Sequence, residues 1–229
     1  MASCREAVAT VFDGARIMFG GFGDVGMPGQ LIEALRDQGA TDLVAISNGA
    51  GGGGYALGGL IQDGRVRKLM ASFPSPRAAA FRERYLKGEL ELELIPQGTL
   101  VERIRAGGAG LGGFYTPTGA GTALAEGKEI RVIDGREYVF EGPLKADFAF
   151  IKAHRADRFG NLSFRRTMRN FNQIMATAAT TVIVEVDEIV PAGGLSAEEI
   201  HTPGIFIDRV VAVARHPQLF QPRKPGGAA

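Results

Sequence analysis

The sequence predicts an α/β fold in which an open, mainly parallel β-sheet is flanked by helices. Over about the first hundred residues, short apolar runs alternate with segments whose apolar residues recur at helical spacing. Glycine clusters at 20–26, 49–54 and 107–113 lie between apolar segments, as expected where a chain turns sharply or approaches a ligand. Because we find no linker and no internal repeat, we predict one domain over residues 1–229, with a frayed Pro/Gly-rich tail at 216–229.

Each element of the first half rests on a local pattern. Pro28 suits a helix N-terminus, where its missing N–H costs nothing, and Leu31, Ile32 and Leu35 then recur at helical spacing up to Gly39. The predicted strands are Ala15–Phe19, Leu43–Ser47, Arg67–Phe73 and Leu90–Ile95, and the further helices are Tyr55–Gln62 and Ala78–Leu86.

The second half contains a hairpin signal. Asp134-Gly135 separates Ile130–Ile133 from Arg136–Phe140, and this dipeptide accepts the positive φ angles of a type I′ turn. The remaining expected elements are strands Phe148–Lys152, Thr181–Val186 and Ile205–Val213 and a helix over Met168–Ala178.

Composition excludes several classes of protein. A net charge of +1 and the lack of long basic runs argue against nucleic-acid binding. Cys4 is the only cysteine, so we expect no internal disulfide and no metal site, and an inert thiol in a mobile N-terminus. Neither a signal peptide nor a membrane span of about 20 apolar residues is visible, which predicts a cytoplasmic protein without a membrane partner.

The first glycine cluster matches a nucleotide-binding pattern, G-x-G-x-x-G, over Gly21–Gly26. A nicotinamide site would also need an acid about 20 residues further on, at the end of the second strand. That strand ends instead at Ser47-Asn48. A nicotinamide-dependent oxidoreductase and a ligand-free turn nevertheless remain alternatives for this loop.

The wider pattern is more specific. Asp13-Gly14, Ile17-Met18-Phe19, Gly20-Gly21-Phe22 and Gly26-Met27-Pro28 fill the constrained positions of the first signature of the coenzyme A-transferases. Further family-like segments are Ser47-Asn48, Arg67-Lys68, Pro96–Leu100, Glu102–Gly110, Phe114–Gly119, Ala146–Ala149, Arg169–Asn172 and His201–Ile205. The chain therefore resembles the first (A-type, or alpha) subunit of the family I 3-oxoacid CoA-transferases over nearly its whole length.

The resemblance implies a reaction and a partner. CoA would pass from succinyl-CoA to a 3-oxo acid by ping-pong chemistry, through a glutamyl-CoA thioester on a second (B-type) subunit. A heterodimer or heterotetramer would form, CoA thioester would be a substrate, and no cofactor would be bound permanently. No Glu-Asn-Gly sequence, the type of motif that carries the nucleophile, occurs in this chain. A non-catalytic scaffold subunit is the remaining alternative.

The acceptor is suggested by one short segment. Ser72-Phe73-Pro74 looks closer to the 3-oxoadipate enzymes than to many acetoacetate enzymes. We therefore favour 3-oxoadipate slightly over acetoacetate as the 3-oxo acid.

Gln97 is the leading candidate for a catalytic residue. It follows a strand and precedes a glycine, so its neutral amide can lie at a strand's carboxyl end and donate to an oxyanion, the role that the resemblance implies. The resemblance also implies a CoA-related role for the glycine loop, whose residues are Gly20, Gly21, Phe22, Gly23, Asp24, Val25 and Gly26. Asn48, with the glycines that follow it, is expected to line the acyl pocket.

Overall fold

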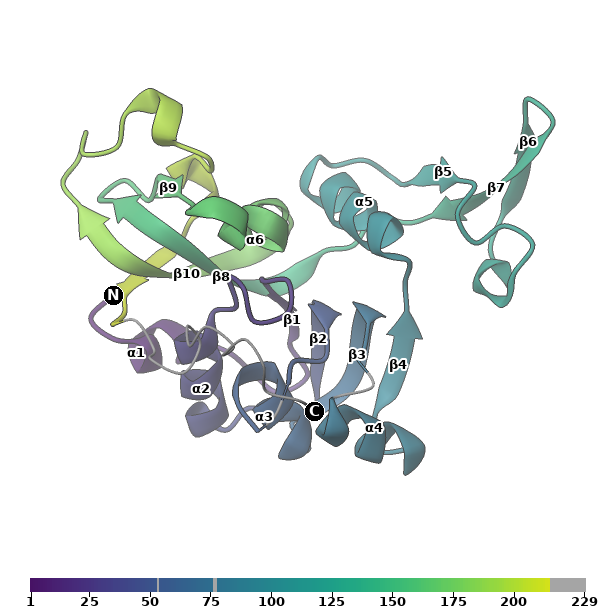
Figure 1. Ribbon diagram of the computed structural model, residues 1–229, viewed down its shortest axis with the longest axis horizontal. Helices are drawn as coiled ribbons and strands as arrows, with labels where there is room; N and C mark the ends of the chain where they lie inside the picture. The colour runs from purple at the N-terminus through teal and green to yellow at the C-terminus, as the bar shows by residue number, and fades with distance from the viewer. Residues whose placement is uncertain (53, 76–77, 215–229) are drawn as a thin grey trace, which may run out of the picture.

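A computed structural model describes residues 1–52, 54–75 and 78–214. Its main sheet has the strand order β11-β10-β8-β1-β2-β3-β4, with β9 added to β8 (Figure 1). The pairs along this order are all parallel, and only β9 runs antiparallel to its neighbour. The expected α/β fold with a mainly parallel sheet is confirmed, and strands from both halves of the chain join the same sheet.

The elements follow one another in the expected alternation. The helices are α1 (Cys4–Val8), α2 (Gly29–Gln38), α3 (Ala56–Gln62), α4 (Ala79–Leu86), α5 (Gln97–Gly108) and α6 (Asn170–Met175). The strands are β1 (Arg16–Phe19), β2 (Leu43–Gly49), β3 (Val66–Phe73), β4 (Glu91–Leu94), β5 (Phe114–Thr116), β6 (Ile130–Ile133), β7 (Arg136–Glu141), β8 (Ala146–Asp157), β9 (Leu162–Ser163), β10 (Ala179–Val190) and β11 (Arg209–Ala212).

Some predicted boundaries were wrong. The strand expected over Ile205–Val213 is confined to β11, because residues 204–206 form a 3-10 turn. The helix expected over Met168–Ala178 is a 3-10 turn at 166–169 followed by the short α6. Cys4 lies in α1, half-buried against the core, so the expected mobile N-terminus is also wrong. The predicted frayed tail at 216–229 lies outside the described residues.

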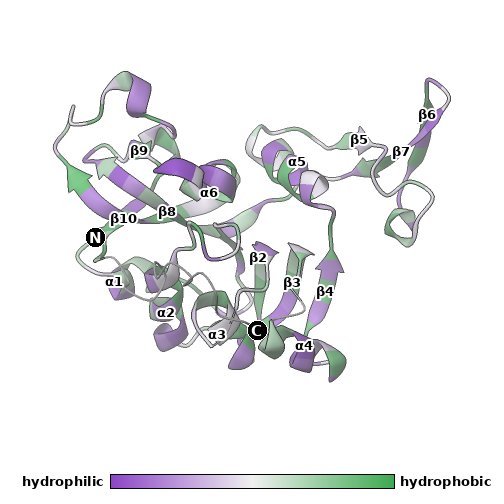
Figure 2. Ribbon diagram, viewed as in Figure 1, coloured by the Kyte–Doolittle hydropathy of each residue, from purple (hydrophilic) through white to green (hydrophobic). Residues whose placement is uncertain are grey.

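Helices cover both faces of the sheet (Figure 1). Helices α1 to α4 lie on one face, where Leu31, Ile32 and Leu35 of α2 pack into a core with Phe19 and Phe150. On the opposite face α5 and α6 cover a second core. Much of α2 and α6 is purple in Figure 2, the colour of hydrophilic residues, as expected for helices that bury only one side.

The predicted hairpin belongs to a separate antiparallel sheet with the order β5-β7-β6, which projects from the body of the molecule (Figure 1). Asp134 and Gly135 both have positive φ angles, 48° and 76°, as the type I′ signal required. The type of turn could therefore be predicted from the sequence, whereas the hairpin's membership in a second sheet could not.

The strand order singles out one position along the main sheet, at the carboxyl end of β1. From β1 the chain adds β2, β3 and β4 on one side, while β8, β10 and β11 lie on the other. In open α/β sheets, ligands bind outside the carboxyl ends of the strands where the order reverses in this way. The glycine loop leaves the carboxyl end of β1 at this point. Within the described part of the chain, no helix is long and apolar enough to cross a membrane.

Candidate active site

A cleft of about 620 Å³ opens at the carboxyl ends of the parallel strands. It is bounded by the tip of the glycine loop, the loop after β2, the end of β3 and the start of α5. The described residues that line it are Phe22, Gly23, Asp24, Asn48, Gly49, Ala50, Gly51, Gly52, Ser72, Phe73, Ser75, Ala78 and Gln97. The structure thus brings together Gln97, Asn48 and part of the glycine loop, which are far apart in the sequence.

Gln97 is the first residue of α5 and directly follows Pro96. Its Nε2 donates a hydrogen bond to Oδ1 of Asn48 over 2.6 Å, and Asn48 itself is buried. One N–H of the amide is therefore occupied in fixing the side chain. The second N–H has no partner among the described residues and remains available to a ligand in the cleft.

Ser72 completes this polar group and was not proposed as a site residue from the sequence. Its Oγ lies 2.8 Å from Oδ1 and 3.0 Å from the carbonyl oxygen of Asn48. Oδ1 of Asn48 thus accepts from Ser72 and Gln97 together, which orients both side chains at the cleft. The signal that could have found Ser72 was its position near the end of a predicted strand.

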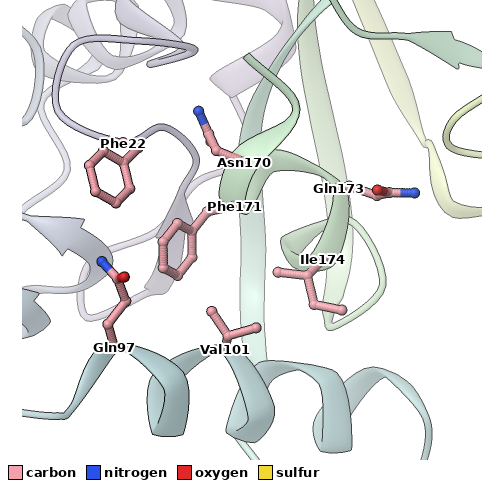
Figure 3. A pocket seen from close by; sticks show the side chains of 7 residues that line it. All are labelled: Phe22, Gln97, Val101, Asn170, Phe171, Gln173 and Ile174. Carbon is pink, nitrogen blue, oxygen red and sulfur yellow. The ribbon is translucent and has the colours of Figure 1, made fainter. Parts of the chain in front are cut away.

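A smaller hollow of about 320 Å³ lies between α5 and α6, next to the cleft. Figure 3 shows Gln97 and Val101 on α5 facing Phe171 and Ile174, with Phe22 beside Gln97. Phe22 and Gln97 line both hollows, so the two spaces meet at these side chains. Sequence reasoning assigned no role to α6, although Arg169–Asn172 was among the segments that resembled the family.

The glycine loop has a supporting part and an exposed tip. Phe22, Gly23 and Asp24 line the cleft, whereas Gly20, Gly21 and Gly26 are buried beneath the tip. Backbone hydrogen bonds in both directions between Phe22 and Val25 close the turn. Of the seven loop residues proposed for CoA, three therefore reach the cleft directly.

Gly21 provides a test of this loop. Its φ is +115°, and a Cβ there would lie 3.1 Å from the backbone of Met27. Gly21→Val is expected to lower kcat/KM at least tenfold in the assembled enzyme, because a β-branched residue at such an angle costs about 1–3 kcal/mol and distorts the loop. Steady-state kinetics with a thermal melt would measure both effects.

Gly88→Val is the matched control for Gly21→Val. Gly88 also has a positive φ, +72°, but a Cβ there would meet nothing within 4 Å. The control should lower the melting temperature and leave the kinetics unchanged. Wild-type kinetics in an assembled Gly21→Val enzyme would show that the loop has no functional role.

Outside the cleft, burial shifts the pKa of two further reactive groups, the Cys4 thiol and the His201 imidazole. Burial, with a smaller contribution from Glu185, raises the pKa of Cys4 to about 11, so its thiol is protonated at neutral pH and a weak nucleophile. Burial likewise lowers the pKa of His201, whose Nδ1 accepts from the backbone N–H of Phe164. Among the described residues, no three His, Cys, Asp or Glu side chains are grouped as metal ligands.

Comparison with known sequences supports a functional assignment. Residues 1–213 match the family model described as Coenzyme A transferase. Over 213 residues, 93% of this chain and 92% of the relative, the chain is 55% identical to the A-type subunit of 3-oxoadipate CoA-transferase of Pseudomonas putida. It is 48% identical to the A-type subunit of a probable succinyl-CoA:3-ketoacid coenzyme A transferase of Bacillus subtilis, over 97% of this chain and 93% of the relative.

Solved structures share the fold. An acyl-CoA transferase of Escherichia coli O157:H7, in a thioester complex with CoA, superposes with a TM-score of 0.85 at 23% identity. The match covers 96% of this chain and 48% of that one, so this chain spans about half of its length. Glutaconate coenzyme A-transferase of Acidaminococcus fermentans gives a TM-score of 0.81 at 22% identity, covering 93% of this chain and 75% of that one.

Proposed function

The chain belongs to the coenzyme A transferase family, and we propose that it is the first, A-type subunit of an enzyme that moves CoA from succinyl-CoA to a 3-oxo acid. The observation that carries the proposal is the polar group Gln97–Asn48–Ser72 at the carboxyl edge of the sheet. It leaves one N–H of the Gln97 amide as a neutral hydrogen-bond donor of the kind that acyl transfer needs, beside a cleft large enough for an acyl group. The names of the relatives, which are A-type subunits, support a two-subunit assembly.

The covalent step belongs, in this proposal, to a glutamate of the second, B-type subunit. Its carboxylate and succinyl-CoA give a glutamyl-CoA thioester and succinate. The carboxylate of the 3-oxo acid then takes the CoA, which gives the 3-oxoacyl-CoA and restores the glutamate. Asp24 is the only carboxylate among the described residues that line the cleft, and it lies at the exposed tip of the glycine loop.

Gln97 acts in these steps as an oxyanion donor. Each attack on a thioester carbonyl places negative charge on its oxygen, and a donor already held in place stabilises this charge without reorganising. Asn48 holds the Gln97 amide through one N–H and leaves the other for the oxyanion. The tip formed by Phe22, Gly23 and Asp24 would contact the CoA thioester or its acyl group, while the rest of the glycine loop supports the tip.

For the acceptor we favour 3-oxoadipate over acetoacetate. Support comes from the 55% identity with the P. putida 3-oxoadipate enzyme and from Ser72-Phe73-Pro74, in which Ser72 and Phe73 line the cleft.

The test is transfer by the co-purified two-subunit enzyme. We expect a higher kcat/KM with 3-oxoadipate than with acetoacetate when succinyl-CoA is the donor, followed by the absorbance of the new 3-oxoacyl-CoA. Equal or reversed values would contradict the acceptor, and no transfer to either acid would contradict the function. The dialysed enzyme should carry neither stoichiometric zinc nor a nicotinamide chromophore; a retained nicotinamide would argue for the oxidoreductase alternative.

A further inference from the structure

One fully buried amide, the side chain of Asn172 on α6, joins the glycine loop to the main sheet. Its Nδ2 donates to the carbonyl oxygens of Gly26 and Met168 over 2.9 and 2.8 Å, and its Oδ1 accepts from the backbone N–H of Lys152 over 2.9 Å. No part of the residue is exposed to solvent. The amide therefore fastens the end of the loop to β8, where Lys152 lies.

The same amide explains two glycines of the loop. A Cβ at Gly20 would lie 1.9 Å from Oδ1 of Asn172, and a Cβ at Gly26 would lie 2.7 Å from its Nδ2. At Gly20 the backbone needs no positive φ, so the space taken by Asn172 accounts for the glycine there. At Gly26 a φ of +75° also favours glycine, so the backbone angle and the amide act together there. Both glycines make room for a side chain of the protein.

Helix α6 also holds the tip of the loop. Asn170 Nδ2 donates to the carbonyl oxygen of Val25 over 2.9 Å, and Val25 is bonded in both directions to Phe22. Phe22 in turn lines both hollows beside Gln97. A change in the contacts of Asn172 would therefore shift the tip against the side chain that we propose as the oxyanion donor.

We propose that Asn172 is a positioning residue for CoA transfer, which acts by setting the shape of the glycine loop. The proposal rests on the transferase function proposed above. Asn172 touches no substrate, because it is buried beneath the loop, and its effect is transmitted through Gly26, Val25 and Phe22. A displacement of catalytic elements by about 1 Å is enough to cost up to about 10²-fold in rate.

A double-mutant cycle between Gly20→Ala and Asn172→Ala tests the coupling in the assembled enzyme. Each single variant is expected to lower kcat by about tenfold or more, with a smaller change in KM. In the Asn172→Ala background, Gly20→Ala should cost less than about twofold, because the conflicting amide is gone and the next atom, Asn172 Cα, would be 3.5 Å away. If Asn172→Ala does not assemble, Asn172→Asp keeps the shape and the acceptor but removes both donors.

Gly108→Ala is the control for a buried clash that leaves Asn172 and its hydrogen bonds to the loop in place. Its Cβ would lie 2.2 Å from Thr177 Oγ1, at the end of α5 opposite Gln97. We expect a lower melting temperature with unchanged kcat. A kcat in Asn172→Ala as high as in this control, or an equal cost of Gly20→Ala in both backgrounds, would overturn the proposal.

Hydrogen exchange provides a readout that does not depend on turnover. Amides of residues 20–27 should exchange faster in Asn172→Ala than in the wild type, and no faster in Gly108→Ala. If the wild-type enzyme transfers no CoA, the proposed function fails, while exchange still decides whether Asn172 holds the loop. Unchanged exchange in Asn172→Ala would refute that structural part directly.

Discussion

The isolated chain is expected to show no CoA-transferase activity, and turnover is expected to appear when its partner is added. The sequence contains no Glu-Asn-Gly motif, Cys4 is protonated at neutral pH, and the described residues that line the cleft include a single carboxylate, Asp24. A donor of hydrogen bonds can stabilise an oxyanion, but it cannot form the thioester that ping-pong transfer requires.

The measurement is transfer by each of the two chains purified separately and by the two mixed. Intact-protein mass spectrometry after addition of succinyl-CoA should find CoA attached to the partner and not to this chain. Substantial turnover by the rigorously purified single chain would contradict the expectation. Asp24, as the carboxylate that lines the cleft, would then be the first residue to replace.

Gln97→Ala is expected to slow transfer by about 10²-fold while the two subunits still assemble, which is the usual cost of removing one oxyanion donor. Gln97 is exposed at the start of α5, and its side chain is held by a hydrogen bond to Asn48. Its loss should therefore affect the fold little. In the proposed role, Gln97 meets charge that develops only in the transition state, so kcat and kcat/KM should fall together with little change in KM.

Steady-state kinetics and a thermal melt on the assembled variant separate three roles. A raised KM with unchanged kcat would mean that Gln97 binds only the ground-state substrate. Unchanged kcat with a lowered melting temperature would remove Gln97 from the active site. Gln38→Ala is the matched control, because Gln38 bonds to the backbone of Val11 and Ala40 at the far end of α2 and should affect stability alone.

Local patterns in the sequence were sufficient for most of the fold. Alternating apolar runs and helical repeats predicted strands β1 to β4 and helices α2 to α4 to within a few residues, because burial on both faces of a parallel sheet leaves a strong local signal. They missed α1, whose five residues are too few for a helical repeat to show. The predictions failed where local propensity was weak. Residues 204–206 are apolar enough for a strand, yet the backbone turns at Gly204, which lies against Phe159 and Gly160.

By itself, the sequence determined the fold class, the resemblance to the transferases and the choice of Gln97, Asn48 and the glycine loop as candidates. Only the tertiary structure showed which of these residues lie together and what they contact. Ser72 joined the site because β2 and β3 are neighbours in the sheet, which sets Ser72 beside Asn48. Asn172 lies about 150 residues from Gly20 and Gly26, so no local pattern could link them. A contact between distant segments depends on how the sheet brings them together, and that information is absent from spacing along the chain.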